Sequence, residues 1–420
     1  MKHLVRIASV SPRVHLGNVT KNCKELETVY RTYAEQVDVI VTPELSLTGY
    51  TCGDLFVNRH LIDRAEEGLL QLAEMTAEYG KKGAALVVGV PYEVDGELFN
   101  CGAFLWNGMV LALVPKIYLP NYGEFYEKRW FSGRCVENRT VELADGSETL
   151  FGNSILIEMT DPNQQEEHVT FGMEICEDLW VPNPPSVAHA YHGANLIVNL
   201  SASDEVVGKD SYRRSLVSAQ SARLLCGYIY ATAGEGESTQ DVVYGGQNLI
   251  AENGTILAES RRFVNGIIYA DLDIHRLDNE RRRMTTCQFA PDLAPEGQDI
   301  SYNEALFTLE REETKLTRKF DSRPFVPGIK EERERRCDEI LNIQAMGLKK
   351  RLAHIHCQNA VIGLSGGLDS TLALLVTVRA FDMLGMDRGK ITAVTMPCFG
   401  TTDRTYNNAC SLSKCLGATL

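Results

Sequence analysis

The sequence predicts an α/β protein of two domains: a large domain built on mixed β-sheets, and a second domain that opens as a doubly wound parallel sheet. Over residues 1–275, short β-branched runs alternate with helical patterns. Some neighbouring strands are joined by tight turns and others by helices, which favours mixed sheets. Near residue 360 a strand leads directly into a glycine-rich loop and a helix, the usual start of a parallel α/β sheet.

The first domain is expected over 1–275 as one layered unit. Strands are predicted at Leu4–Val10, Val37–Thr42, Ala85–Val90, Phe99–Trp106, Met109–Val114, Val169–Cys176, Asn195–Leu200, Tyr228–Thr232, Gln247–Ala251 and Ile267–Leu272. Helices are predicted at Asn18–Gln36, with Asn18 as N-cap, and at Leu61–Tyr79, Pro184–His192 and Asp210–Cys226.

Residues 276–325 are rich in charge and proline and are predicted to form a linker, with a helix near Tyr302–Arg318. The second domain is expected over 326–420. Its predicted elements are a long helix at Ile329–His356, a strand at Ala360–Leu364, a helix at Asp369–Met383, a strand at Ile391–Met396 and a helix near Thr402–Leu416. Two parallel strands cannot bury both faces of their sheet, so we expect this domain to be truncated.

The composition is that of an ordinary globular protein, with 44% hydrophobic and 23% charged residues among 420. Lys and Arg number 42 and Asp and Glu 56, which gives a net charge of −14 without a dense basic block. We therefore expect no nucleic-acid partner and no membrane surface. The 12 cysteines include no C-x-x-C pair, and no apolar run approaches a membrane span, which together predict a cytoplasmic protein with reduced thiols.

The second domain carries the string SGGLDS at residues 365–370, between the apolar strand and the helix. Glycines let the backbone approach an anion, and the helix N-terminus adds partial positive charge. Asp369 would repel a bare phosphate, so we expect a metal ion between this carboxylate and a pyrophosphate. The alternative is an ordinary tight turn from strand to helix with an Asp or Ser cap. The loop has neither the Walker A nor the G-x-G-x-x-G spacing, so it is not one of these two phosphate-binding motifs.

Three chemically active residues follow predicted strands of the first domain: Glu44, Lys116 and Cys176. Side chains at the carboxyl ends of strands gather in one crevice of an α/β sheet. A carboxylate could deprotonate the thiol, and an ammonium could stabilise the oxyanion that forms when the thiolate attacks an amide. The alternatives are a buried structural cysteine with surface charges, or a Cys–His dyad that uses His189 or His192.

The strings VTPELSLTGY, PKIYLPNYGEFYEKRWF and EICEDLW around these residues resemble the signatures of the nitrilase (carbon–nitrogen hydrolase) superfamily. More narrowly, they resemble the glutaminase domain of the glutamine-dependent NAD+ synthetase family, which joins such a domain to an SGGxDS synthetase domain in this order. The resemblance covers residues 1–275 and about 325–420. It implies a nitrilase-like α-β-β-α sandwich followed by the start of a Rossmann-like ATP-binding domain.

The resemblance implies Glu44 as general base, Lys116 as oxyanion stabiliser and Cys176 as nucleophile. Glu124 is similar to a second carboxylate that steadies the lysine. Tyr122 and Ser203 resemble glutamine-binding positions. Lys209 stands where an arginine that contacts the substrate carboxylate is expected, and lysine keeps the charge without the bidentate fork. The alternative for these binding positions is ordinary loop polarity.

The SGGLDS string resembles the loop of ATP pyrophosphatases, which cleave ATP between its α- and β-phosphates to adenylate a substrate. The implied ATP site consists of Gly363, Leu364, Ser365, Gly366, Gly367, Leu368, Asp369 and Ser370, with Asp369 also a ligand of Mg2+. Met396–Thr402 resembles the segment that borders the nucleotide. The family's remaining synthetase contacts are expected beyond the present sequence, so synthetase activity of these 420 residues alone is in doubt.

The implied reaction hydrolyses glutamine to glutamate and passes the ammonia to ATP-activated deamido-NAD. A dry route between the two sites would keep the ammonia unprotonated. The resemblance also implies a homo-oligomer. Three rival functions are another glutamine-using ligase, an amidase with an inactive synthetase remnant, and a silent binding module. The first would need a G-x-C-x-G elbow or an N-terminal cysteine, and neither is present.

Overall fold

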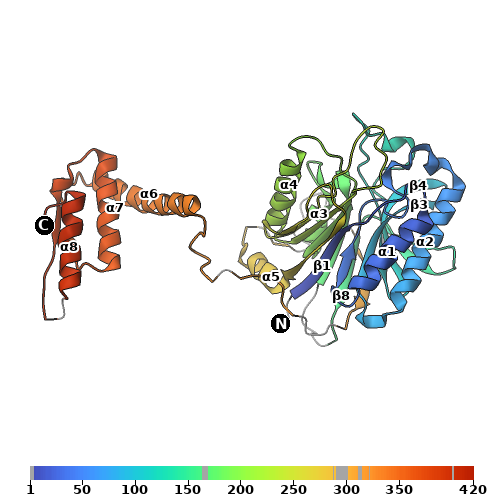
Figure 1. Cartoon of the computed structure of the whole chain (residues 1–420), viewed down its shortest axis with the longest axis horizontal. Helices are drawn as coiled ribbons and strands as arrows, with labels where there is room; N and C mark the ends of the chain where they lie inside the picture. The colour runs from blue at the N-terminus through green and yellow to red at the C-terminus, as the bar shows by residue number, and fades with distance from the viewer. Residues whose placement is uncertain are drawn as a thin grey trace. The chain divides into compact units, whose positions relative to one another are not determined.

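The computed structural model describes residues 4–162, 169–286, 288–289, 301–310, 315–320, 322–399 and 402–420. It divides into two compact units, Met1–Arg318 and Lys319–Leu420. In Figure 1 the second unit contains α6, α7 and α8, drawn in orange to red.

The part of unit 1 that the structure describes forms two β-sheets. The eight-stranded sheet has the order β14 (Gly266–Asp273), β1 (Leu4–Ser11), β2 (Val39–Val41), β3 (Ala85–Val94), β4 (Glu97–Trp106), β5 (Met109–Pro115), β7 (Glu148–Phe151) and β6 (Arg139–Glu142). The seven-stranded sheet has the order β13 (Thr255–Glu259), β12 (Leu249–Glu252), β11 (Gly227–Thr232), β10 (Leu196–Ser201), β9 (Val169–Ile175), β8 (Ile155–Thr160) and β15 (Asn303–Thr308). Both sheets mix parallel and antiparallel pairs, as predicted.

Helices cover the outer faces of the two sheets (Figure 1). Helices α1 (Val19–Tyr33) and α2 (Arg59–Ala77) pack on the eight-stranded sheet, and α3 (Pro185–Tyr191) and α4 (Lys209–Leu224) pack on the seven-stranded sheet. A separate core lies between the sheets and includes Val41, Phe104, Phe171 and Val198. These layers confirm the predicted α-β-β-α sandwich.

The remaining helices within the described residues of unit 1 are short. They are α5 (Ile274–Arg283) and the 3-10 helices η1 (Tyr50–Val57), η2 (Gly80–Lys82), η3 (Glu127–Arg129) and η4 (Cys176–Leu179). The predicted N-cap of α1 is confirmed, since the Asn18 side chain accepts a hydrogen bond from the Lys21 N–H.

The prediction of a helix near Tyr302–Arg318 is wrong for the residues of this segment that the structure describes. Asn303–Thr308 forms β15, which pairs in parallel with β8, and residues 311–314 lie outside the described residues. Ala305 and Phe307 are buried while Leu306 between them is exposed, the period of two that a half-buried strand requires. Much of the expected linker, including α5 and β15, therefore belongs to unit 1, which extends to Arg318.

Unit 2 contains α6 (Lys330–His354), β16 (Ala360–Gly363), α7 (Leu368–Leu384), the 3-10 helix η6 (Arg388–Lys390), β17 (Ile391–Val394) and α8 (Asp403–Leu416). Strands β16 and β17 pair in parallel with α7 between them in sequence, as predicted. Leu374, Phe381 and Ala409 lie in its core.

No helix within the described residues is both long enough and apolar enough to cross a bilayer.

Candidate active site

The three active residues predicted in the first domain each follow a strand. Glu44 follows β2 and Lys116 follows β5, both in the eight-stranded sheet, whereas Cys176 follows β9 of the seven-stranded sheet. All three are buried: Glu44 is 1% exposed, Lys116 0% and Cys176 9%. The site is therefore assembled from both sheets.

The Lys116 ammonium lies between two carboxylates. Its Nζ donates to Glu44 Oε1 at 2.6 Å and to Glu127 Oε1 at 2.7 Å. Burial alone would lower the pKa of Lys116, but Glu127 and Glu44 outweigh burial and hold the pKa well above its ordinary value. The ammonium is thus charged. Two of its three N–H groups make these two described contacts, and the third is left over.

Glu44 is held by both sheets. Its Oε1 accepts from Asn100 Nδ2 at 2.7 Å, and its Oε2 accepts from the Ala202 N–H at 2.9 Å. Asn100 lies in β4 and Ala202 directly follows β10. The carboxylate is fixed in one orientation beside the lysine.

The second carboxylate on Lys116 is Glu127, and the prediction of Glu124 for this place is wrong. Glu124 is exposed, whereas Glu127 is buried and also accepts a hydrogen bond from Tyr50 Oη at 2.6 Å. Burial raises the pKa of Glu127 to about 7, against the opposing effect of Lys116. Both glutamates stand in one loop three residues apart, so the sequence alone did not separate them.

Cys176 occupies a strained turn between β9 and η4. Its φ of 45° lies in the left-handed region, which a residue with a Cβ rarely adopts. Its N–H donates to Asn199 Oδ1 at 3.3 Å, and Asn199 Nδ2 donates to Tyr228 Oη at 3.1 Å. The hydroxyl of Tyr228 donates in turn to Glu174. A series of buried hydrogen bonds thus stabilises the turn at Cys176.

The Cys176 thiol lies in a buried, charged environment. Burial and the neighbouring Glu44 raise the pKa of the thiol well above its ordinary value, while Lys116 and the Ala202 N–H lower it. The thiol is therefore protonated at rest, and a base must remove its proton before it can attack. Glu44 is a carboxylate placed close enough to influence that proton.

The alternative Cys–His dyad is not supported. His189 is buried with its Nε2 at 3.0 Å from the Met173 carbonyl oxygen and its Nδ1 at 2.8 Å from Tyr302 Oη. Burial lowers the pKa of His189 to about 4. The ring of His192 stacks on that of Tyr302, and its Nδ1 lies 2.8 Å from the Ala188 carbonyl oxygen. Both histidines have structural partners.

A cavity of about 310 Å³ reaches the buried ion cluster from one side. Its lining residues are Tyr50, Thr51, Gly53, Asp54, Glu124, Phe125, Tyr126, Glu127, Trp130, Ser238, Gln240, Asp241, Val242 and Tyr244. Glu127 thus both contacts Lys116 and lines this cavity. Tyr122 is exposed nearby in sequence and donates to Glu177 Oε1 at 2.8 Å.

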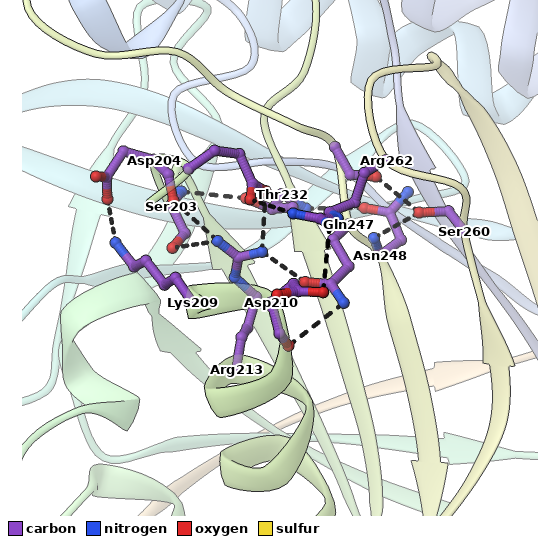
Figure 2. Close-up of polar contacts among 12 residues, drawn as sticks. Ser203, Asp204, Lys209, Asp210, Arg213, Thr232, Gln247, Asn248, Ser260 and Arg262 are labelled. Atoms are coloured by element: carbon purple, nitrogen blue, oxygen red, sulfur yellow. Dashed lines mark hydrogen bonds and ion pairs between the residues drawn. The ribbon is translucent and has the colours of Figure 1, made fainter. Parts of the chain in front are cut away.

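The other predicted binding residues meet around Arg213 (Figure 2). The Lys209 ammonium pairs with Asp204 and lies 5.5 Å from the centre of the Trp180 ring. Ser203 Oγ accepts from Arg213 Nη2 at 3.1 Å, and Arg213 Nη1 donates to Gln247 Oε1 at 2.6 Å. Arg213 is fully buried and fixes this loop, a role for which the sequence pattern gave no signal.

The SGGLDS loop of unit 2 lies between β16 and α7, as predicted. Gly366 has a φ of 80°, and a Cβ there would lie 1.9 Å from the Thr405 carbonyl oxygen, so only glycine fits. A cavity of about 780 Å³ lies against this loop and the start of α8; its lining includes Gly366, Gly367, Leu368, Thr371, Thr402, Arg404, Thr405 and Asn408. Asp369 is exposed in the first turn of α7, and within the predicted border segment Gly400 and Thr401 lie outside the described residues.

Comparisons with known proteins match both units. Residues 6–282 match the family model described as carbon-nitrogen hydrolase, and residues 340–420 match the one described as NAD synthase. The glutamine-dependent NAD(+) synthetase of Mycobacterium tuberculosis is 37% identical over 422 residues, covering 99% of this chain and 60% of that protein. The chain thus spans about 60% of the length of these curated relatives.

Solved structures share the fold. A glutamine-dependent NAD+ synthetase from Acinetobacter baumannii, in complex with ADP, is similar with a TM-score of 0.53 and 21% identity, covering 99% of this chain and 64% of that one. A mutant of an amidase of the nitrilase superfamily from Nesterenkonia AN1 is similar with a TM-score of 0.51 and 20% identity, covering 67% and 96%. With its layers, its buried Glu–Lys–Cys site and the match over residues 6–282, the chain belongs to the carbon-nitrogen hydrolase family.

Proposed function

We propose that this chain carries the glutaminase part and the ATP-loop part of a glutamine-dependent NAD+ synthetase. The observation that carries the proposal is the convergence of Glu44, Lys116 and Cys176 at one buried site, in a chain that also holds the SGGLDS turn. The relatives that align over nearly the whole chain bear that name.

In the proposed glutaminase reaction, Glu44 takes the Cys176 proton and the thiolate attacks the amide carbon of glutamine. The remaining N–H of the Lys116 ammonium and nearby backbone N–H groups stabilise the oxyanion. Protonated Glu44 then donates its proton to the departing nitrogen, which releases ammonia and leaves a thioester. Water, deprotonated by Glu44, hydrolyses the thioester to glutamate and restores the thiol.

We propose that Tyr122, Ser203 and Lys209 contribute to glutamine binding, and that Glu124 does so from the lining of the cavity beside Glu127 rather than by steadying Lys116. The positive charge of Lys209 would face the substrate carboxylate, while Asp204 and the Trp180 ring limit its freedom of movement. Because Asp204 already pairs with the ammonium, the substrate would share this charge, and glutamine affinity would depend on that competition.

In unit 2 we propose that residues 363–370 hold the phosphates of ATP. The support is the loop's position at the N-terminus of α7, the approach that Gly366 permits, and the hydroxyls of Ser365 and Ser370, which lie 3.1 Å apart. ATP would adenylate deamido-NAD, and the ammonia would then form the amide of NAD.

Magnesium fits this loop only together with the nucleotide. No cluster of three or more His, Cys, Asp or Glu side chains suited to a metal occurs within the described residues, and Asp369 supplies a single exposed carboxylate. Mg2+ commonly takes one or two carboxylates and completes its shell with water and substrate phosphates. Asp369 would hold it, and the ion would offset phosphate charge when bound.

We also propose that the protein acts in the cytoplasm as a homo-oligomer. The cysteines at 23, 52, 101, 135, 176, 226, 337, 357, 410 and 415 are free thiols, which suits a reducing compartment.

The first experiment measures glutamate release from glutamine by the 420-residue chain, with Cys176→Ala as the comparison. We expect release by the unmutated chain and its loss in the variant, because the thiol forms the covalent intermediate. Equal release by both chains would refute the site. If the unmutated chain is inactive both alone and with a complete synthetase domain added, glutamine is the wrong amide.

A further inference from the structure

One buried carboxylate near the site has no part in the proposed chemistry. Asp178 lies in η4, two residues after Cys176, and is 1% exposed. Its neighbour Glu177 is half-buried and is bonded by Tyr122, whereas the side chain of Asp178 turns to backbone groups. A buried carboxylate carries a large desolvation cost unless it is fully hydrogen-bonded.

The hydrogen bonds of Asp178 join the two catalytic segments. Its Oδ1 accepts from the Ile117 N–H at 3.2 Å and from the Tyr118 N–H at 2.9 Å, directly after Lys116. Its Oδ2 accepts from the Ile175 N–H at 3.0 Å, directly before Cys176. Each oxygen thus holds one side of the active site.

These two segments belong to different sheets. Lys116 follows β5 of the eight-stranded sheet and Cys176 follows β9 of the seven-stranded sheet. Apolar packing between the sheets is non-directional, so it does not by itself orient the backbone of the two segments. A buried side chain that accepts from three backbone N–H groups fixes the distance and orientation of the two segments.

We propose that Asp178 is a positioning residue that holds the Lys116 ammonium in register with the Cys176 nucleophile across the sheet interface. The inference rests on the proposed glutaminase function, because it assumes that these two groups act on one substrate. Asp178 itself does not contact the reacting atoms. Its contribution is the placement of the oxyanion-stabilising charge, which a shift of about 1 Å would impair.

The test uses Asp178→Asn, which keeps the shape but replaces one acceptor oxygen with a donor NH2. In either orientation of the asparagine amide, its NH2 group faces a backbone N–H group of one of the two segments. The hydrogen bond to that segment is then lost. Asp271→Asn is the matched control. Asp271 is likewise buried and accepts from the Thr317 and Arg318 N–H groups at 2.8 and 3.1 Å, but it lies on strand β14.

Two rates are measured on the full 420-residue chain: kcat and KM for glutamine, and the alkylation of Cys176 by iodoacetamide, followed by peptide mass spectrometry. We expect Asp178→Asn to lower kcat about tenfold or more with KM changed by less than about threefold. Lys116 lowers the thiol pKa, so its displacement should also slow the alkylation. Asp271→Asn should leave both rates within about twofold, although it loses stability.

The proposal is overturned if Asp178→Asn keeps kcat and the alkylation rate within about twofold, or if Asp271→Asn lowers both equally, since the effect would then be general loosening. If glutamine is not a substrate of the unmutated chain, the proposed function fails but the alkylation comparison still decides the positioning role. Should Asp178→Asn not fold, Asp178→Glu is judged by the same criteria, because it keeps the acceptors and displaces them by one methylene.

Discussion

At the scale of single residues, the site concentrates charge on buried side chains. Glu44, Lys116 and Glu127 form a cluster of one cation and two carboxyl groups, none of them more than 2% exposed. Two ionised carboxylates this close to one ammonium leave an excess negative charge. Burial and Glu44 therefore favour the protonated form of Glu127.

The raised pKa of Glu127 predicts a pH-dependent stability. In the unfolded chain this carboxyl titrates near 4.5, whereas burial raises its pKa to about 7 in the fold. The native state therefore holds the proton more tightly, so stability from this group is full below about pH 4.5 and is lost as pH rises toward 7. At 1.36 kcal/mol per pKa unit, the loss is on the order of 3 kcal/mol.

Glu127→Gln should remove this group's contribution to the change of the free energy of unfolding with pH. Urea unfolding of both chains at about pH 5 and about pH 8 gives four free energies of unfolding. We expect the decrease between these pH values to be smaller in the variant, because an amide does not titrate in this range. A parallel decrease in both chains would show that Glu127 does not titrate in this range.

At the scale of elements, strand ends position the site, and glycine in a neighbouring strand allows this. A Cβ at Gly89, in β3, would lie 2.1 Å from the Leu45 backbone nitrogen and 2.6 Å from the Pro43 carbonyl oxygen. The backbone around Glu44 therefore packs directly on β3. Leu45 itself has a φ of 49°, so the turn that presents Glu44 is already strained.

Gly89→Ala should displace this turn. We expect glutamate release to fall by about a hundredfold and the free energy of unfolding to drop by about 2 kcal/mol or more, because backbone atoms cannot make room as a flexible side chain can. Gly266→Ala is the control, since Gly266 is also a strand residue but has open space around its would-be Cβ. If both variants behave alike, close backbone approach at Gly89 is not what places Glu44.

The elements that could be predicted from the sequence are those whose own residues determine them. Buried strands such as β1 and β10 are runs of β-branched and apolar residues, and Asn18 caps α1 through its own side chain. The strand β15 could not be predicted, because its pairing with β8 joins residues nearly 150 positions apart. The roles of Glu127 and Arg213 could not be predicted for the same reason. Their partners are brought to them by the fold and not by a spacing in the sequence.

At the scale of the whole molecule, unit 1 ends in a buried ionic anchor. Asp271 Oδ2 accepts from the N–H and hydroxyl groups of Thr317, and the guanidinium of Arg318 donates to both oxygens of the fully buried Glu252 at 2.6 and 2.8 Å. The chain leaves unit 1 directly after this anchor. A glutaminase unit cut at the expected boundary near residue 275 would lack both the anchor and β15.

Two shortened chains test this boundary. Residues 1–318 should fold and hydrolyse glutamine, because they include every described element of both sheets and the anchor. Residues 1–300 lose the buried side chains of Ala305, Phe307 and Leu309, and burial of one large apolar side chain is worth about 1.5–3 kcal/mol. Together with the anchor, this loss is comparable to the whole stability of a domain, about 5–15 kcal/mol.

We therefore expect the chain of residues 1–318 to unfold cooperatively and to release glutamate, and the chain of residues 1–300 to aggregate or melt without a cooperative transition. Circular dichroism during heating measures the first property, and the glutamate assay measures the second.

A point variant separates the contribution of the strand β15 from that of the anchor. Arg318→Ala in the longer chain leaves Glu252 with Arg276 as its remaining cationic partner among the described contacts. That variant should be less stable yet active, because β15 still covers the edge of the seven-stranded sheet. Cooperative, active folding of residues 1–300 would instead mean that the sandwich is complete without β15.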